Sequence, residues 1–304
     1  MKKIITSVIT LLFICNMNIA AKAEETYSPD TVYYTNAEGV NFTKSDYDKI
    51  INCFGTDAIN NMDSDTVREL LSEEILTSGE STTIYVQLIE TVDKYGKVTN
   101  TYQNVLDEDT GEQLANDYPI EVYSMSQEVT HTTSMKKITL YMYIGGSISY
   151  RQVLLTNEWI SLPTIRSYDI IALRPGKASA TVGLESVRGY QIWDGTTIDY
   201  NTTEDNYVYK SGLGQGTGGL AFSMNLKDNA STKIINKLKV TFLTGAESFT
   251  VYGTYQHATE NVSLATSQKY KFSSSGMGGV LKFNSSSVAA KYDNTKGLSA
   301  TVTY

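Results

Sequence analysis

The sequence predicts a mainly β protein: a jelly-roll-like antiparallel β-sandwich preceded by a small helical N-terminal unit. From residue 82 onward, short segments rich in Tyr, Val, Ile, Thr and Phe alternate with clusters of Gly, Asn, Asp and Ser. Only 4 prolines occur in the whole chain, and many short strands between turns are typical of a sandwich, with a barrel as the alternative. In residues 36–79, by contrast, apolar residues recur at the three- and four-residue spacing of helices.

Residues 1–23 have the three parts of a secretory signal peptide. Two lysines at the start are followed by an apolar run at 4–14 and a small-x-small motif at 21–23. We therefore expect cleavage after Ala23 and a mature chain that begins at Glu24. The apolar run is too short to cross a bilayer, which takes about 20 residues. These features predict a secreted, extracellular protein.

The charge of the chain limits its partners, and its cysteine content indicates where it comes from. Loss of residues 1–23 removes three lysines and no acidic residue, so the net charge moves from −8 to −11. An acidic protein without a basic cluster is a poor partner for nucleic acid or anionic lipid headgroups. Cys53 is the only cysteine after cleavage, so no internal disulfide is expected. Secreted animal modules usually depend on disulfides, whereas a chain of about 280 residues can bury a sufficient core without a disulfide. Together with the signal peptide, this indicates an exported bacterial protein.

Residues 24–79 are predicted to form a small helical module. Thr43 is followed three residues later by an acid, as in a capping box, and Gly55 follows the apolar residues as a C-terminal glycine does. Asp63 is expected to cap a further helix. The apolar face of that helix carries Val67, Leu70, Leu71 and Ile75. Because so small a unit buries little area alone, we expect it to dock on another part of the protein, with Cys53 on the docking side.

Residues 80–127 are expected to form a hairpin and a polar linker. The segment TIYVQLIETV, a turn at 94–97 and the segment after the turn predict the hairpin. The stretch at 104–119, NVLDEDTGEQLANDYP, is polar and rich in turn-forming residues, which predicts a linker. The remaining residues, 128–304, are assigned to the antiparallel sandwich.

Two glycine-rich segments have features of nucleotide-binding loops. In GLGQGTGG at 212–219, the glycines satisfy the spacing G-x-G-x-x-G. A dinucleotide site needs a helix that opens on the last glycine, whereas LAFSMNL at 220–226 alternates like a strand. The glycines at 276–279 also lie between two strand-like segments. Both segments are therefore predicted to be turns, in which glycine supplies positive φ.

Aromatic residues, among them 22 tyrosines, are the most distinctive feature of the composition. They favour strands, and exposed rings beside Asn, Asp and Thr also form stacking platforms for sugars or proteins. The predicted ligand-binding group comprises Trp193, Asp194, Tyr190, Tyr200 and Trp159. For any single ring, the alternative is that β-propensity alone explains its presence.

A calcium site is a further prediction. Asp107, Asp109 and Glu112 imitate the first half of an oxygen-ligand loop, and Gly111 allows the turn. The full twelve-residue pattern is missing, and a solvated acidic linker explains these residues equally well. Apart from calcium, the sequence predicts no cofactor.

Catalytic chemistry finds little support in the sequence. His131 and His257 are the only histidines, and we expect His257 at the surface, where a strand meets a turn. A glycosidase needs two carboxyl groups across one sugar bond. Glu158, Asp169 and Glu185 are candidates, but their spacing selects no pair. We predict no catalytic residue and no enzymatic activity.

Two stretches resemble known sequences. Residues 33–70, YYTNAEGVNFTKSDYDKIINCFGTDAINNMDSDTVREL, resemble an N-terminal module of uncharacterised secreted proteins of Gram-positive bacteria, with a Y-x-N-x-x-G-V core followed by helices. Residues 157–174, NEWISLPTIRSYDIIALR, resemble a β-rich region that follows this module in some of those proteins. The resemblance implies export and a β-rich C-terminal domain, and it assigns no catalytic residue.

The leading functional prediction is a non-enzymatic extracellular interaction protein or carbohydrate-binding protein of a bacterium. Its partner would be a carbohydrate or another component of a host or cell surface, and nucleic acid is not expected. Two alternatives remain open. A β-type pore-forming toxin would bind membranes through an amphipathic hairpin such as KASATVGLESV at 177–187, and a secreted glycoside hydrolase would use a carboxylate pair.

Overall fold

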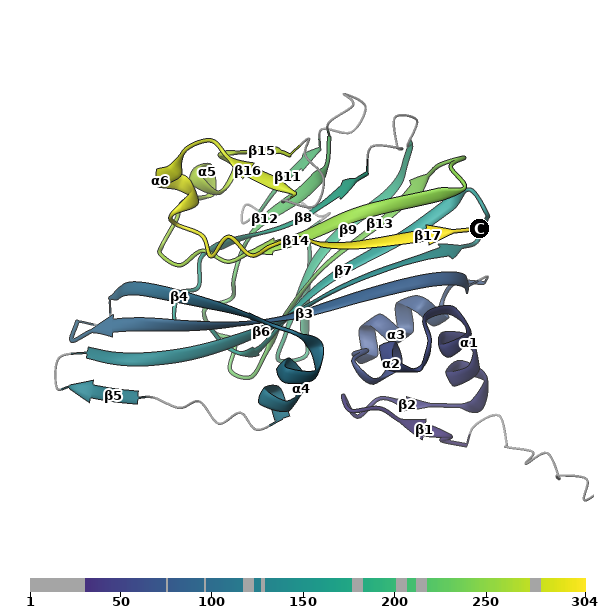
Figure 1. The fold of residues 1–304 in the computed structure, drawn as a ribbon, viewed down its shortest axis with the longest axis horizontal. Helices are drawn as coiled ribbons and strands as arrows, with labels where there is room; N and C mark the ends of the chain where they lie inside the picture. Colours follow the sequence, from purple (N-terminus) through teal and green to yellow (C-terminus); the bar gives the residue numbers. More distant parts are fainter. Residues whose placement is uncertain are drawn as a thin grey trace, which may run out of the picture.

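The computed structural model describes residues 31–74, 76–95, 97–116, 123–126, 129–176, 183–200, 207–211, 218–273 and 280–304. Two antiparallel sheets pack face to face in it, and a helical unit lies against the outer face of the larger sheet (Figure 1). The predicted class, a mainly β antiparallel sandwich with a small helical N-terminal unit, is confirmed. The expected signal peptide, residues 1–23, lies outside the described residues. Within them, no helix combines the length and apolar character needed to cross a membrane.

The larger sheet has eight strands in the order β10-β9-β13-β7-β6-β3-β4, with β5 paired to β6. Its strands are β3 (Leu76–Asp93), β4 (Val98–Leu106), β5 (Tyr123–Ser126), β6 (Val129–Gly145), β7 (Tyr150–Ser161), β9 (Gly183–Trp193), β10 (Thr196–Asp199) and β13 (Ile234–Leu243). Each of these neighbours pairs in antiparallel orientation. The strands β4 and β10 form the two edges of this sheet.

The smaller sheet has five strands in the order β11-β12-β8-β14-β17. Its strands are β8 (Tyr168–Pro175), β11 (Tyr207–Ser211), β12 (Leu220–Asn225), β14 (Ser248–Gln256) and β17 (Leu298–Thr303). A third layer packs on its outer face through a separate apolar cluster. That layer consists of α5 (Leu264–Ser267), β15 (Tyr270–Phe272), β16 (Leu281–Phe283) and α6 (Ser286–Ala289).

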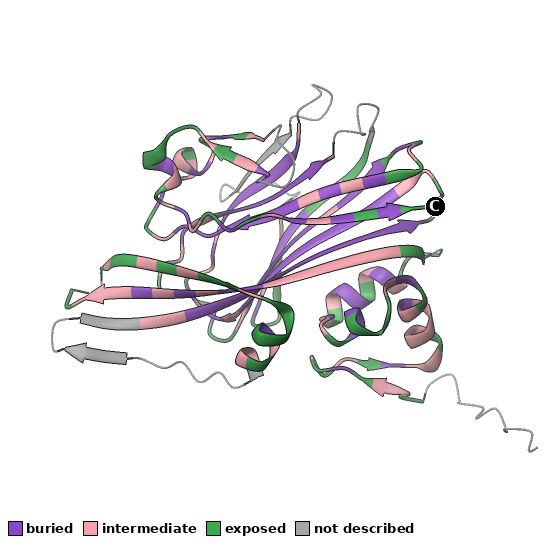
Figure 2. Cartoon of the chain, in the orientation of Figure 1, coloured by how far each residue is buried: buried purple, intermediate pink, exposed green. Residues whose placement is uncertain are grey.

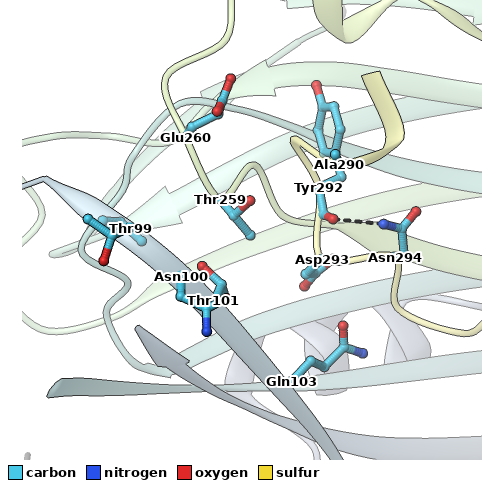
Figure 3. A pocket seen from close by; sticks show the side chains of 11 residues that line it. Thr99, Asn100, Thr101, Gln103, Thr259, Glu260, Ala290, Tyr292, Asp293 and Asn294 are labelled. Carbon is cyan, nitrogen blue, oxygen red and sulfur yellow. Dashed lines mark hydrogen bonds between the residues drawn. The ribbon is translucent and has the colours of Figure 1, made fainter. Parts of the chain in front are cut away.

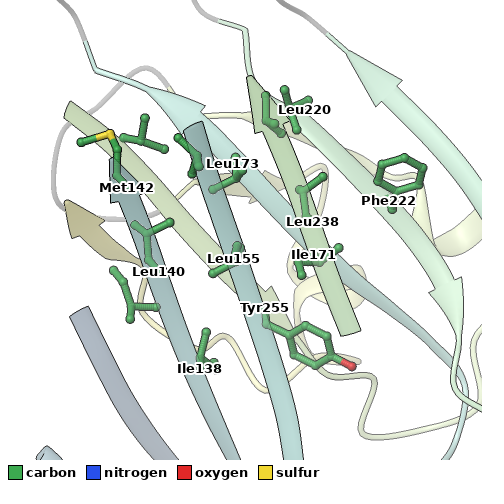
Figure 4. Packing of buried hydrophobic residues seen from close by; sticks show 14 of the residues in the cluster. Ile138, Leu140, Met142, Leu155, Ile171, Leu173, Leu220, Phe222, Leu238 and Tyr255 are labelled. Carbon is green, nitrogen blue, oxygen red and sulfur yellow. The ribbon is translucent and has the colours of Figure 1, made fainter. Parts of the chain in front are cut away.

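The main core lies between the two sheets (Figure 4). In β6, Leu140 and Met142 point into this core, while Tyr141 and Tyr143 between them point to the opposite face and meet the helical unit. Both faces of the central strands are therefore covered, and these strands are buried along most of their length (Figure 2). Each fully buried aliphatic side chain stabilises the fold by roughly 1.5–3 kcal/mol.

The helical unit follows the predicted capping signals. It contains β1 (Tyr34–Thr35), β2 (Asn41–Phe42), α1 (Lys44–Phe54), α2 (Thr56–Asn60) and α3 (Ser64–Leu71). The Thr43 side chain accepts the Asp46 N–H at the start of α1, and Gly55, with φ 85°, ends that helix. The Asp63 carboxylate accepts two backbone N–H groups at the start of α3. α3 ends at Leu71, and Ile75, which was expected on its apolar face, lies outside the described residues.

Cys53 faces the sheet, as the sequence predicts. Its side chain is buried in the cluster that α1 shares with Tyr141 and Tyr143 of β6. It packs so tightly that a Cβ atom on Gly79 of β3 would lie 2.6 Å from its sulfur. Cys53 therefore fills the interface between the helical unit and the larger sheet.

The segment 80–127 differs from the expected hairpin and linker. The hairpin exists as β3 and β4, but β3 pairs with β6 from Leu76 to Asp93, so the hairpin is part of the larger sheet. Within the expected linker, residues 108–116 form helix α4 (Glu108–Asn116). The linker prediction is wrong there, because the Asp107 carboxylate accepts the Thr110 N–H at 2.8 Å and so caps a helix.

The strands on either side of each glycine-rich segment pair in antiparallel orientation. Ser211 of β11 pairs with Leu220 of β12 across the first segment, and β15 pairs with β16 across the second. Residues 212–217 and 274–279 themselves lie outside the described residues. Gly219 is required for space: a Cβ atom there would lie 2.5 Å from the Leu173 carbonyl oxygen.

Candidate functional site

The predicted aromatic binding group does not form an exposed platform. Trp159, Trp193 and Tyr200 belong to the main core and are 0%, 8% and 2% exposed. Tyr190 points to the other face of β9, where its hydroxyl donates to Glu69 of α3 at 3.0 Å. None of these four rings is exposed enough to serve as a stacking platform, because tyrosine and tryptophan serve here as core residues on both faces of one sheet.

Asp194 has a structural role in the turn after β9. It has a positive φ of 44°, and its carboxylate accepts hydrogen bonds from the backbone and hydroxyl groups of both Ser231 and Thr232. These hydrogen bonds, from Thr232 first and then Ser231, lower the pKa of Asp194 below its ordinary value. Because all of these donors come from one neighbouring loop, Asp194 holds that loop against the turn.

The predicted calcium residues lie at the start of a helix and not in an oxygen-ligand loop. Asp107 caps α4, and hydrogen bonds from Thr110 lower its pKa below the ordinary value. Glu112 accepts a hydrogen bond from Asn61 of the helical unit, and Asp109 is exposed on α4. Among the described residues, no group of three His, Cys, Asp or Glu side chains is placed to hold a metal ion.

The three candidate carboxylates do not form a glycosidase pair. Glu158 points to the outer face of β7 and forms ion pairs with Lys137 and Lys233 at 3.2 and 2.6 Å. Burial raises the pKa of Glu158, but these two positive charges outweigh it and hold the pKa below its ordinary value. Asp169 points between the two sheets, and Glu185 is exposed on β9. No two of them face each other across a cleft.

His257 is buried, which corrects the expected surface position. Its Nδ1 atom lies 3.0 and 3.1 Å from the two carboxylate oxygens of Asp169, and neither side chain is exposed. The imidazole also packs edge-on against Trp159, with ring centroids 4.7 Å apart. His257 and Asp169 are 88 positions apart, so the contact could not be identified from the sequence.

Further buried polar groups surround this pair. The Tyr255 hydroxyl donates to Asp169 at 2.6 Å and accepts from the Asn236 amide at 3.0 Å. Burial, and then the Asp169 charge, raise the pKa of Tyr255 well above its ordinary value. The phenol therefore stays protonated and serves as a donor inside the sandwich.

Lys136 and Asp293 complete this set as a fully buried ion pair. The Lys136 ammonium also lies over the rings of Trp159 and Tyr255, 5.6 and 5.0 Å from their centroids. Asp293 turns its other oxygen, Oδ1, toward the backbone N–H groups of His257 and Thr295. We refer to Lys136, Asp169, Tyr255, His257 and Asp293 as the inner polar cluster.

The sequence carried one signal for the inner polar cluster. Lys136 occupies the same strand face as Ile138, Leu140 and Met142, at alternate positions of a strand. A lysine in an apolar face must find a buried partner or leave the core. That partner, Asp293, follows 157 residues later in a loop and could not be identified from spacing.

A polar groove lies beside the cluster and is the candidate binding site (Figure 3). Its volume is about 420 Å³. One wall is β4, which contributes Val98, Thr99, Asn100, Thr101 and Gln103. The opposite wall contributes Thr259, Glu260, Ala290, Tyr292, Asp293 and Asn294. We refer to this hollow as the β4 groove.

The β4 groove exposes the edge of a strand. Successive side chains of a strand point to opposite faces of the sheet, yet four consecutive residues, 98–101, line the groove. The pairing of β4 with β3 is irregular at this point, because Thr91 pairs with Asn100 and Val92 with Val98, and the alternation is therefore interrupted. In the part of the chain that the structure describes, β4 pairs with β3 on one side and has no strand on the other. An edge of this kind carries unpaired backbone N–H and C=O groups.

The opposite wall of the β4 groove is held in place by local contacts. The Asn294 amide donates to the carbonyl oxygens of Tyr292 and Ala289 at 2.8 and 2.9 Å. Glu260 pairs with Lys291. Tyr292 is 3% exposed and stacks on Phe283, so its ring is not available to a ligand in the groove.

Comparisons with known proteins place the chain in no family. No protein-family model and no curated protein matches it. Among solved structures, the C-terminal domain of the Streptococcus agalactiae AgI/II polypeptide BspA matches with 8% identity and a TM-score of 0.25, over 57% of this chain and 79% of that chain. The C-terminal domain of the Streptococcus pyogenes antigen I/II-family protein AspA matches with 10% identity and a TM-score of 0.26, over 57% and 80%. Neither match identifies a function for this chain.

Proposed function

We propose that this protein is a secreted, non-enzymatic binding protein that receives an extended polypeptide segment in the β4 groove. The observation that carries the proposal is that one edge of β4, along a wall of a polar hollow, pairs with no strand of the described residues. An extended peptide that adds to such an edge gains main-chain hydrogen bonds over several residues. The proposed secretion rests on the signal-peptide pattern of residues 1–23.

The chemistry of the groove favours a peptide over a sugar. Carbohydrate sites use exposed aromatic rings as stacking platforms, and the one ring among the groove residues, Tyr292, is buried against Phe283. The groove instead offers the amide groups of Asn100 and Gln103 and the hydroxyl group of Thr101 beside the strand edge. Such groups hydrogen-bond the side chains of an added strand while the edge binds its backbone.

The alternatives of a glycoside hydrolase and a pore-forming toxin gain less support from the structure. Of the carboxylates considered for a glycoside hydrolase, Glu158 lies on the outer face of the larger sheet, where it pairs with Lys233, and Asp169 of the smaller sheet lies between the sheets, where it accepts from Tyr255. Of the segment considered for a membrane-inserting hairpin, residues 183–187 form part of β9 within the larger sheet, and 177–182 lie outside the described residues.

Binding to arrays of linear peptides and of glycans tests the proposal. We expect the secreted chain to bind a subset of the peptides and none of the glycans. Thr101→Arg, which places a long charged side chain in the groove, should weaken peptide binding by roughly tenfold or more. Asn104→Arg is the matched control, because Asn104 is an exposed residue of β4 outside the groove lining, and it should bind as the natural chain does.

Two results would count against the proposal. Binding to glycans without binding to peptides would make the protein a carbohydrate-binding protein. Equal loss of peptide binding in Thr101→Arg and Asn104→Arg, or no loss in either, would show that the peptide does not bind in the β4 groove.

A further inference from the structure

We propose that Lys136 and Asp293 are joined by a covalent amide bond between the lysine Nζ and the aspartate Cγ. Asp293 also lines the β4 groove, but the inference does not depend on the proposed function, because the two reacting side chains are 0% exposed and no bound peptide takes part. It rests on three features of the inner polar cluster: the complete burial of both reacting side chains, the aromatic groups that enclose them, and two N–H donors directed at the aspartate carboxyl.

The first feature is burial of the amine, which among the described residues has no hydrogen-bond partner other than Asp293. Both side chains are 0% exposed and in direct contact. Besides Asp293, the surroundings of the amine are the rings of Trp159 and Tyr255. An ion pair in such a dry site loses the hydration of both charges. Transfer of one proton from the ammonium to the carboxylate leaves an amine and a carboxylic acid, which are neutral and are the forms that react with each other.

The second feature is the environment of the carboxyl group. Asp293 Oδ2 faces the amine, while Oδ1 accepts the backbone N–H groups of His257 at 3.0 Å and Thr295 at 3.5 Å. Two fixed donors on one oxygen polarise the carbonyl and stabilise the negative charge that develops there when an amine attacks the carbon. The fold also holds the two groups in contact permanently, which replaces a bimolecular encounter by an intramolecular one.

The proposed reaction balances without an additional reagent. The Nζ–Cγ bond forms and the Cγ–Oδ2 bond breaks. Oδ2 leaves as water, with one hydrogen from the carboxylic acid and one from the amine. The His257 imidazole packs on the same Trp159 ring as the amine, and its Nε2 has no hydrogen-bond partner among the described residues. It is therefore the adjacent group that can carry the proton between nitrogen and oxygen.

A second buried Lys–Asp pair in this protein provides an internal comparison. Lys237 contacts Asp63 at 2.7 Å and is also 0% exposed. Its ammonium, however, also donates to the Thr66 hydroxyl at 2.9 Å, and the Asp63 carboxylate accepts the backbone N–H groups at the start of α3. The Thr66 hydroxyl distinguishes this pair from Lys136 and Asp293, because it accepts from the Lys237 ammonium and donates to the second Asp63 oxygen. We expect no covalent bond between Lys237 and Asp63.

Mass spectrometry of the denatured, full secreted chain tests the proposal. The intact mass should be lower than the mass of its sequence by one water molecule. After trypsin digestion, the peptide 292–296 should be found linked to the peptide that contains Lys136, with no cleavage after Lys136. Lys237 should be unmodified. The Lys136→Met variant should have the full mass of its own sequence.

A second variant keeps the test informative if Lys136→Met does not fold. In Asp293→Asn the same amide bond forms with loss of ammonia, so the mass should be lower than that of its own sequence by one ammonia molecule. An intact mass equal to the unmodified sequence in the folded natural chain would overturn the proposal. So would a water loss that persists in Lys136→Met, because that loss would come from ring closure within the aspartate backbone.

Discussion

The ammonium group of Lys237, in the middle of β13, lies 2.7 Å from the Asp63 carboxylate at the start of α3. Asp63 thereby has two functions: it caps α3 and it binds the helical unit to the outer face of the larger sheet. Lys237 is completely buried at this contact. The orientation of the helical unit on the sandwich therefore depends on a buried charge pair as well as on apolar packing.

Replacement of Asp63 by Asn should destabilise the protein at neutral pH by about 2–4 kcal/mol, because it leaves the buried Lys237 ammonium without its counter-charge. Asn is an equally good N-cap, so the loss reports the charge pair and not the cap. Denaturant unfolding measures the difference. Asp65→Asn is the control: Asp65 pairs with an exposed Arg68, so its loss should cost less than about 1 kcal/mol. Equal losses in both variants would contradict this assignment.

The same contact predicts an acid-sensitive contribution to stability. Burial raises the pKa of Asp63, but the Lys237 charge and hydrogen bonds from Lys237 and Thr66 outweigh it and lower the pKa from 3.8 to about 2. Because the folded protein binds this proton more weakly than the unfolded chain, the contribution, about 2 kcal/mol, is complete above about pH 4 and is lost as the pH falls toward about 2. Unfolding curves of the natural chain and Asp63→Asn should therefore converge between these pH values. A difference that stays constant with pH would show that charge is not its cause.

The Cys53 thiol should react slowly in the folded protein. Burial raises its pKa to about 12, so the reactive thiolate is scarce, and the side chain is covered by the larger sheet. A maleimide should label it slowly until denaturant is added. Cys53→Ala should cost about 1 kcal/mol, at the low end for removal of a core group. Fast labelling of the native protein, or a disulfide-linked dimer in the culture supernatant, would contradict this assignment.

Gly219→Ala should destabilise the protein by about 1–3 kcal/mol, because the added methyl group overlaps the Leu173 carbonyl oxygen and the Phe272 ring. Gly245→Ala is the matched control, since a Cβ atom there meets nothing within 4 Å, and it should change stability by less than about 0.5 kcal/mol. Thermal unfolding of both variants distinguishes crowding from a general cost of replacing glycine. Similar effects at the two positions would contradict the proposed crowding.

The features that sequence predicted well are local ones. The Thr43 and Asp63 caps depend on residues within a few positions of one another, and both are found where they were expected. The Asp107 cap of α4 is also local, but its sequence was interpreted as a linker because acids and glycine are common to caps and turns.

The candidate sites depend on contacts between distant residues and could not be predicted in the same way. Both faces of the larger sheet are covered, so the alternation of apolar and polar residues does not tell an exposed ring from a buried one, as Trp159 and Tyr190 illustrate. The Asp169–His257 and Lys136–Asp293 contacts join residues 88 and 157 positions apart. The edge position of β4 is a property of strand order, which no local pattern specifies.

Hydrogen exchange measured with and without bound peptide tests the central claim most directly. The peptide is the tightest binder from the linear-peptide array, and the protein is the full chain. We expect backbone amides of residues 98–103 to become protected on binding, because the free edge of β4 gains hydrogen bonds. The opposite edge strand, β10 (Thr196–Asp199), should exchange at an unchanged rate. Protection at β10 or elsewhere, with the amides of β4 unchanged, would contradict strand addition in the β4 groove.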